Sequence, residues 1–370
     1  MVKKYIIIIV FLIIFTMIIS GCTDLFYSGN TGITYESHPT KVSFTISYGY
    51  LVECKGSGNY EINYDCDSPS VLKGEIGEIT VHNNDYNIVT IASYNNIYRW
   101  RINSNKNTDY NLGLTVDVIS ESYLVSDLTG ANSLTIDQIR TENQMIASYP
   151  YNAYSQYCRA QSNGTVNFID PNNPEIIDNA TEIYNNSGTD NAFIVAKDLF
   201  IWLKQKTSYQ IHSESNDVQP ASFTLQCRTG DCDDLSFLYI SLCRSIGIPA
   251  RFIRGILIDK NEAIPHAWVE VYVGGNIGKD GWIPVECAGT SNDPEVEVNQ
   301  NFGVESAGHL RLFKDDGSNE SLIASLSGIS YRMFSMNRDI SSQSITQVVD
   351  FTELISQELN IDNNGYRSYQ

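Results

Sequence analysis

Positive charge is scarce in this 370-residue chain, which has 24 lysine and arginine residues against 43 aspartate and glutamate residues. The formal net charge of −19 repels the phosphate backbone of nucleic acids, so we expect no nucleic-acid partner. The sequence has no pair of closely spaced CxxC units, which removes the usual basis for a zinc site, and it has no internal repeats. With 42% hydrophobic and 18% charged residues it is not globally disordered, and its length fits two or three domains.

The N-terminal segment indicates where the protein resides. Lys3 and Lys4 form a basic head, and the run from Tyr5 to Ile19 carries no charge. It ends in Ile19-Ser20-Gly21-Cys22, which matches a lipobox, in which small residues precede the cysteine that receives lipid. We therefore expect residues 1–21 to be a lipoprotein-type signal peptide and Cys22 to anchor an extracytoplasmic protein to the cell membrane. The alternative is an uncleaved transmembrane anchor, although the run is short of the ~20 residues that a span needs.

Seven of the 8 cysteines follow Cys22, so at least one thiol is free unless it pairs with another chain. Cys54 and Cys66 flank a segment, residues 55–59, that reads as the turn of a hairpin. In that hairpin Cys54 faces Tyr60, whereas Cys66 lies near Tyr48. Cys54 and Cys66 would then be too far apart to form a disulfide. We therefore expect these two thiols to be free or to pair elsewhere.

Strand and helix patterns divide the rest of the chain. Residues 22–40 have no period and are interpreted as a tether, whereas residues 41–135 alternate apolar and polar positions, as in Val42 to Tyr50 and Leu112 to Val118. The alternation predicts an all-β, sandwich-like N-terminal domain. Helical spacing follows over 175–184 and 191–206, so we expect a catalytic core over 136–300 and a C-terminal extension over 301–370.

A helix is predicted directly after Gly230-Asp231-Cys232, because apolar residues recur on one stripe from Leu235 to Ile246. Cys232 lies at the N-terminal end of this helix, where the helix dipole favours a thiolate and free N–H groups can receive an oxyanion. Asp233 and Asp234 oppose the thiolate electrostatically, so a basic partner is required. With such a partner, Cys232 should have the lowest thiol pKa in the chain. Cys243, deeper in the same helix, is expected to be a packing residue.

Two strands after the helix supply the partners. His266 to Val273 and Trp282 to Glu286 both alternate in the manner of strands. If they are antiparallel neighbours, His266 and Glu286 share a face at the helix N-terminus. Thiol catalysis needs these three roles: a nucleophile, a base, and a carboxylate that orients the imidazole. Asp280 is the alternative carboxylate if Glu286 points away.

The motifs together resemble the core of the transglutaminase-like superfamily over roughly residues 165–290. They are Gly-Asp-Cys at a helix start, Gly-Ile-Pro-Ala-Arg, His-Ala-Trp-Val-Glu-Val-Tyr and Gly-Trp-Ile-Pro-Val-Glu. The resemblance implies an α+β, papain-like core in which the cysteine-bearing helix packs on an antiparallel sheet. It also implies a Cys-His-Asp triad, which maps to Cys232, His266 and Glu286, with Glu in place of the family's Asp. No cofactor and no metal are expected.

Members of this superfamily act on amide bonds through a thiolate. We therefore expect a hydrolase of peptide or amide bonds, with a protein or peptide substrate at the cell surface or in the cell wall. Two alternatives stay open: a protein-cross-linking acyltransferase, and a non-catalytic surface lipoprotein that binds or scaffolds other proteins while retaining the fold.

Overall fold

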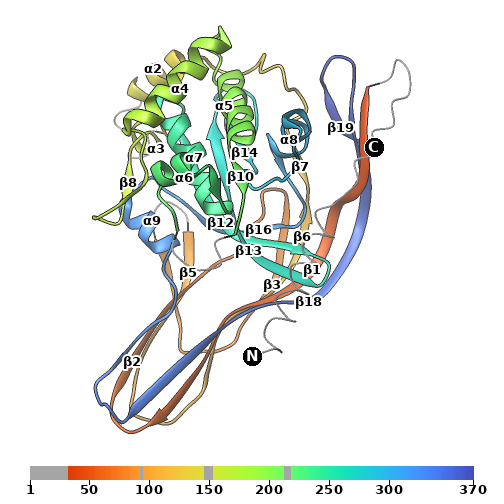
Figure 1. The fold of residues 1–370 in the computed structure, drawn as a ribbon. Helices are drawn as coiled ribbons and strands as arrows, with labels where there is room; N and C mark the ends of the chain where they lie inside the picture. Colours follow the sequence, from red (N-terminus) through yellow and green to blue (C-terminus); the bar gives the residue numbers. More distant parts are fainter. Residues whose placement is uncertain (1–31, 92–94, 146–152, 212–217) are drawn as a thin grey trace, which may run out of the picture.

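The computed structural model describes residues 32–91, 95–145, 153–211 and 218–370, and the predicted signal peptide and Cys22 lie outside them. The fold is α+β, as predicted: an elongated β-sheet region carries a helix-covered region at one end (Figure 1). Within the described ranges, none of the helices combines the length and apolar character that crossing a membrane requires.

Two sheets form the elongated β region. The larger sheet has five strands, in the order β19 (Arg367–Tyr369), β18 (Arg338–Ile361), β1 (Ile33–Gly56), β6 (Tyr110–Glu121) and β3 (Gly74–Val81). The smaller sheet has four strands, in the order β17 (Ser330–Met333), β2 (Tyr60–Asp67), β5 (Asn95–Ser104) and β4 (Asn87–Ile91). The alternation predicted from the sequence is confirmed, because Phe44 and Ile46 of β1 and Leu114 of β6 are buried in the core between the two sheets.

The predicted hairpin between β1 and β2 is wrong. β1 pairs with β6 and β18, whereas β2 pairs with β5 and β17, so residues 57–59 carry the chain from one sheet to the other. Cys54 nevertheless contacts Tyr60, as expected, because the two residues meet across the core instead of along a hairpin. Both Cys54 and Cys66 are buried free thiols, which confirms that they do not form a disulfide.

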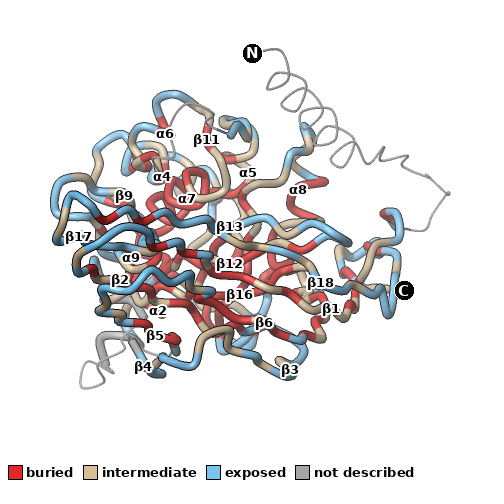
Figure 2. The backbone as a smooth tube through the Cα atoms, turned by 90° about the horizontal axis from the view of Figure 1, so that it is seen from below, coloured by how far each residue is buried: buried red, intermediate tan, exposed pale blue. Residues whose placement is uncertain are grey.

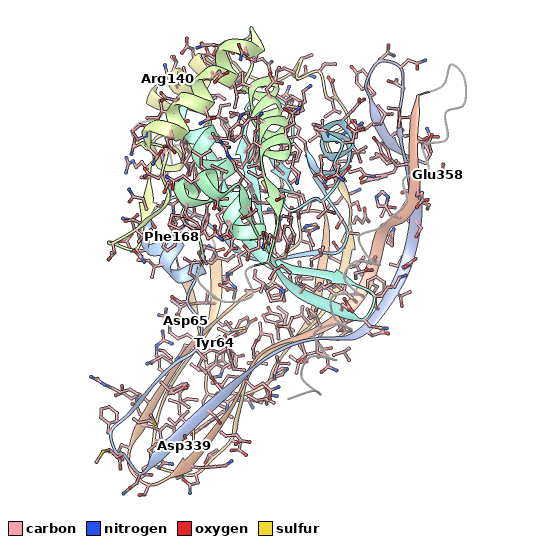
Figure 3. All side chains as sticks on the ribbon, viewed as in Figure 1. Tyr64, Asp65, Arg140, Phe168, Asp339 and Glu358 are labelled. Carbon is pink, nitrogen blue, oxygen red and sulfur yellow. The ribbon has the colours of Figure 1, made fainter. Side chains whose placement is uncertain are left out.

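Strand β18 pairs with β1 along its whole length, from Ile33↔Ile361 to Gly56↔Arg338. Figure 3 labels Asp339 and Glu358 near its two ends, which are far apart in the molecule. β1 therefore starts inside the segment predicted as a tether. The last segment, residues 301–370, contributes strands to all three of the larger sheets instead of forming a separate extension.

The helix-covered region is built on a four-stranded antiparallel sheet. Its strands lie in the order β14 (Trp282–Val285), β13 (Glu262–Tyr272), β12 (Ala250–Asp259) and β16 (His309–Lys314). Its helices are α2 (Ile136–Met145), α3 (Ala153–Tyr157), α4 (Pro174–Ser187), α5 (Ala192–Lys206), α6 (Ala221–Cys227), α7 (Cys232–Ser245), α8 (Pro294–Asn301) and α9 (Asn319–Ser325). Three short ladders complete the region: β7 (Tyr123–Leu124) with β15 (Val304–Glu305), β8 (Gln161–Ser162) with β9 (Asn167–Ile169), and β10 (Ser208–Tyr209) with β11 (Thr229–Gly230).

Helix α7 is the central element of this region, and every residue in it from Asp234 to Arg244 is buried (Figure 2). Its apolar side chains share one core with α4, α5 and the inner residues of β13, among them Val269 and Val271. Cys243 belongs to that core, as predicted, and burial raises the pKa of its thiol well above the ordinary value. A helix packed on all sides fixes the position of its own N-terminal residue, which is Cys232.

Candidate active site

The approach to Cys232 is fixed by hydrogen bonds around the start of α7. Asp231 is the N-cap, and its backbone N–H donates to Asp234 Oδ2 at 3.2 Å. The other oxygen of Asp234 accepts from the backbone N–H of Gln219 at 2.7 Å. Gly230 packs so closely on Asp234 that an added Cβ would lie 2.6 Å from the Asp234 Cβ. The Gly-Asp approach therefore serves to hold the cysteine at the helix N-terminus.

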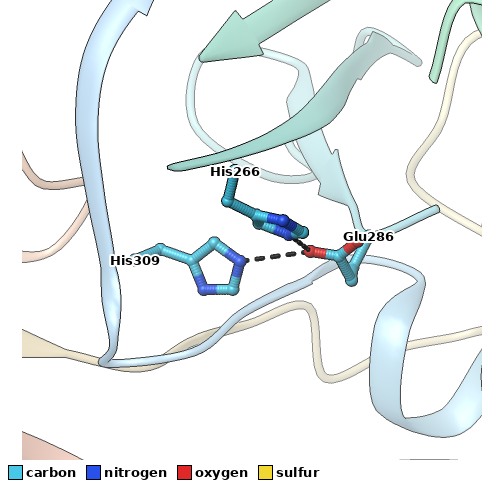
Figure 4. Close-up of side chains that lie close together, drawn as sticks. All are labelled: His266, Glu286 and His309. Carbon is cyan, nitrogen blue, oxygen red and sulfur yellow. Dashed lines mark hydrogen bonds and ion pairs between the residues drawn. The ribbon is translucent and has the colours of Figure 1, made fainter. Parts of the chain in front are cut away.

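His266 and Glu286 come together as the sequence predicted. β13 and β14 are antiparallel neighbours, with Val269 opposite Val285. His266 Nε2 donates a hydrogen bond to Glu286 Oε2 at 2.6 Å (Figure 4). The imidazole also forms a hydrogen bond with the Cys232 thiol, which leaves Nδ1 as the nitrogen on that side. The alternative carboxylate, Asp280, lies in the β13–β14 turn and lines a different cavity, so it does not orient His266.

Burial and charge set the protonation of this pair. Burial lowers the pKa of His266, but the charge and hydrogen bonds of Glu286 and Cys232 outweigh it and raise the pKa to about 10. Burial raises the pKa of Glu286, but the hydrogen bonds and charges of His266 and His309 hold it well below the ordinary value. At neutral pH the site therefore contains an imidazolium beside a carboxylate.

The thiol departs from the expectation for a helix N-terminus. Burial raises the pKa of Cys232, while the hydrogen bond and charge of His266 act in the opposite direction. The thiolate thus depends on the imidazolium more than on the helix. The neighbouring carboxyl groups of Asp233 and Asp231 act in the same direction as burial and also raise the pKa of Cys232. Burial and the neighbouring Asp231 carboxyl group in turn raise the pKa of Asp233 to about 9.

His309, the first residue of β16, also belongs to the site, although the sequence patterns did not predict it. Its Nε2 lies 3.2 Å from Glu286 Oε2, so two imidazoles share one carboxylate oxygen (Figure 4). Its Nδ1 lies 2.8 Å from Ser306 Oγ. The last of the motifs ends at Glu286. A single histidine that follows them belongs to no periodic pattern, so the sequence does not indicate a functional role for it. The only available signal was scarcity, because the chain has just 5 histidines.

Hydrogen bonds from its own backbone and from helix α5 fix the segment that follows Glu286. The backbone N–H of Ala288 donates to Glu286 Oε1 at 2.7 Å, so both carboxylate oxygens are occupied. Lys204 of α5 donates to the carbonyl oxygens of Cys287, at 3.1 Å, and of Gly289, and it forms a buried ion pair with Glu297. These contacts fix the backbone from which Glu286 projects.

Two groups of side chains in the described part of the chain have ligand atoms close enough to hold a metal ion: His266, Glu286 and His309, and Asp231, Cys232 and Asp233. In the first group, the 2.6 Å separation between His266 Nε2 and Glu286 Oε2 is that of a hydrogen bond. Two ligands of one zinc ion, each about 2.0–2.1 Å from it in tetrahedral geometry, lie farther apart than that. The observed geometry is therefore that of a proton-sharing network.

A cavity of about 370 Å³ borders His266, Glu286 and His309. Its wall includes Tyr209, Leu257, Ile264 and Val304. Tyr209 reaches this position because β10 pairs in parallel with β11, which places Tyr209 opposite Gly230, two residues before Cys232. The cavity gives a molecule outside the protein access to the histidine and carboxylate side chains.

Part of this chain is similar to a known protein family. Residues 180–287 match the family model of the transglutaminase-like superfamily. An uncharacterised protein of Mycobacterium leprae is 32% identical over 87 residues, which cover 20% of this chain and 29% of that protein. The chain thus spans less than a third of that relative's length.

Two solved structures match this chain at low sequence identity. A candidate cysteine protease from Cytophaga hutchinsonii is 15% identical, with 90% of this chain and 99% of that chain covered and a TM-score of 0.49. The periplasmic domain of TgpA from Pseudomonas aeruginosa is 12% identical, with 74% of this chain and 96% of that chain covered and a TM-score of 0.30. Cys232, His266 and Glu286 all fall within the segment that the family model matches. Residues 180–287 of this chain are a domain of the transglutaminase-like superfamily.

Proposed function

We propose that this protein is an extracytoplasmic thiol enzyme that hydrolyses peptide or amide bonds with Cys232 as nucleophile and His266 as base and acid. The observation that carries the proposal is the continuous set of hydrogen bonds from Cys232 to His266 to Glu286, formed at the N-terminus of a buried helix. Such an arrangement provides the three roles of thiol catalysis.

The chemistry follows from the positions of these groups. The Cys232 thiolate attacks the carbonyl carbon of a substrate amide, and N–H groups of the first turn of α7 stabilise the oxyanion. His266 Nδ1–H gives its proton to the leaving amine as the C–N bond breaks, which leaves a thioester on Cys232. His266 then takes a proton from water, the resulting hydroxide attacks the thioester, and the C–S bond breaks to release the acid. Glu286 keeps the imidazole oriented throughout these steps and stabilises it whenever it is protonated.

A protein or peptide chain suits the cavity beside the triad. Its wall combines apolar side chains, such as Leu257 and Val304, with the acidic side chains of Asp259 and Glu262 near the β12–β13 turn. A substrate side chain can occupy this space while its neighbouring amide reaches Cys232. An amine that enters in place of water would produce acyl transfer, so the same site supports protein cross-linking as the alternative reaction.

Casein incubated with the full chain, with and without monodansylcadaverine, tests the proposal. New peptides that depend on Cys232 indicate hydrolysis, and dansyl incorporation indicates acyl transfer. Iodoacetamide with peptide mapping tests the nucleophile itself: Cys232 should react before Cys158 and before buried Cys243. If Cys232 stays unmodified in the folded protein and casein is unchanged, the protein is a scaffold.

The location of the protein is proposed from the N-terminal segment. A lipid on Cys22 would hold the enzyme at the outer face of the cell membrane. Mass spectrometry of the mature N-terminus from membranes should give a lipidated Cys22, and Cys22→Ser should leave an uncleaved or released protein. A mature chain that still begins at Met1 would favour a transmembrane anchor.

A further inference from the structure

His309 faces the carboxylate of Glu286 with a nitrogen that must carry a proton. An ionised carboxylate only accepts hydrogen bonds, so His309 Nε2, at 3.2 Å from Oε2, is the donor. When the imidazole is neutral, its Nδ1 is then unprotonated. The Ser306 hydroxyl, at 2.8 Å, donates to Nδ1 and selects that tautomer.

The position of the His309 ring is fixed independently of Glu286. His309 is buried and pairs with Leu257 of β12, at the start of the edge strand β16. Its ring lies edge-on to Trp268, with 4.8 Å between ring centroids. Its backbone N–H also donates to the carbonyl oxygen of Ser306 at 3.1 Å. A ring held this firmly can hold its hydrogen-bond partner in place.

The presence of glutamate where the superfamily has aspartate fits this arrangement. β14 and β16 are the two edge strands of the sheet, so a carboxylate that follows β14 must reach across toward β16 to meet His309. The additional methylene of Glu286 lengthens that reach. The carboxylate then accepts from His266, His309 and the Ala288 N–H, which leaves it little freedom to turn away.

We propose that His309 is a positioning residue for the triad: its Nε2–H holds the Glu286 carboxylate against His266, and Ser306 sets the His309 tautomer that makes this possible. The inference rests on the proposed function of Cys232 and His266. It extends the working site beyond the segment 180–287 matched by the family model, into β16.

The test is the rate at which iodoacetamide alkylates Cys232 in the full chain at pH 7. His309→Gln places an amide N–H near the position of Nε2, whereas His309→Leu has a similar size and no donor. Both variants lose the ring contact with Trp268, so they differ chiefly in the hydrogen bond to Glu286. We expect His309→Leu to react about tenfold more slowly than wild type, the loss typical of one hydrogen bond to a charged group. His309→Gln should stay within about twofold, and Ser306→Ala should fall between the two.

The outcomes separate this inference from the proposed function. If His266→Ala leaves alkylation of Cys232 unchanged, the proposed function fails, and this inference fails with it. If His266→Ala slows alkylation but His309→Leu does not, the proposed function stands and the role of His309 is refuted. Equal slowing by Leu and Gln also refutes it, because the packing of the ring on Trp268 would then be what matters. Thermal melts of each variant verify that the rates refer to folded protein.

Discussion

Replacing Glu286 by glutamine tests the electrostatics of the site most directly, because it removes one charge and nearly preserves the shape of the side chain. The surroundings of buried His266 raise its pKa from 6.5 to about 10, although burial alone would lower it. At about 1.4 kcal/mol per unit, this shift corresponds to about 5 kcal/mol, and Glu286 is the larger of the two favourable contributors. Without that carboxylate the pKa of His266 falls, and the pKa of the Cys232 thiol, which burial already raises, rises further.

The expected result is a fall of about 10²- to 10³-fold in the pH 7 alkylation rate of Cys232, with a comparable loss of turnover. Because hydroxide removes the thiol proton without help from His266, the difference between variant and wild type should disappear at strongly alkaline pH. Glu182→Gln makes the same chemical change on the exposed surface of α4 and should react like wild type. A Glu286→Gln protein that is folded and alkylated at the wild-type rate at pH 7 would refute the assignment of Glu286.

Three further predictions follow from the same contacts. The raised pKa of His266 means that its pairing with Glu286 stabilises the fold fully below about pH 6.5 and loses this effect as pH rises through about 10; the difference in Tm between wild type and Glu286→Gln should shrink over that range. Lys204→Met should lower the free energy of unfolding by about 3–5 kcal/mol in urea titrations, because it leaves the buried Glu297 carboxylate without its cation; a loss below 1 kcal/mol would contradict this. Gly255→Ala should cost about 1–3 kcal/mol, because the new Cβ meets the Leu310 carbonyl oxygen and lies 2.8 Å from the Trp268 ring, and an unchanged melting curve would contradict that packing.

The periodicity of apolar residues predicted individual helices and strands, because each of these depends mainly on neighbouring residues in the sequence. The period of the apolar residues identified α7 and the alternating strands β1, β6 and β13, and the expected pairing of β13 with β14 brought His266 to Glu286. The alternation of apolar and polar residues indicates which face of a strand is buried, but it does not indicate which strand lies beside it. For this reason the sequence predicts a hairpin after β1, whereas residues 57–59 connect two different sheets.

The remaining features depend on distant parts of the chain. β18 is exposed or half-buried over most of its length, so its sequence lacks the clear alternation that would have revealed a strand paired with β1. His309 reaches Glu286 only because β16 joins the sheet beside β12. The pKa of Cys232 is raised by side chains packed around it, whereas the sequence shows only the helix N-terminus that would lower it.

The pairing of β1 with β18 determines the order in which the protein can fold. Thr34 and Asn360 form a hydrogen bond across 326 residues of sequence, so the first strand of the described chain has no partner on that side until nearly the whole chain has been synthesised. Closing such a long loop is slow, and folds rich in distant contacts form slowly. His309 likewise reaches Glu286 only when β16 pairs with β12, so the site also depends on contacts between separate segments of the chain. We therefore expect the pairing of these two long strands to be a late step in folding.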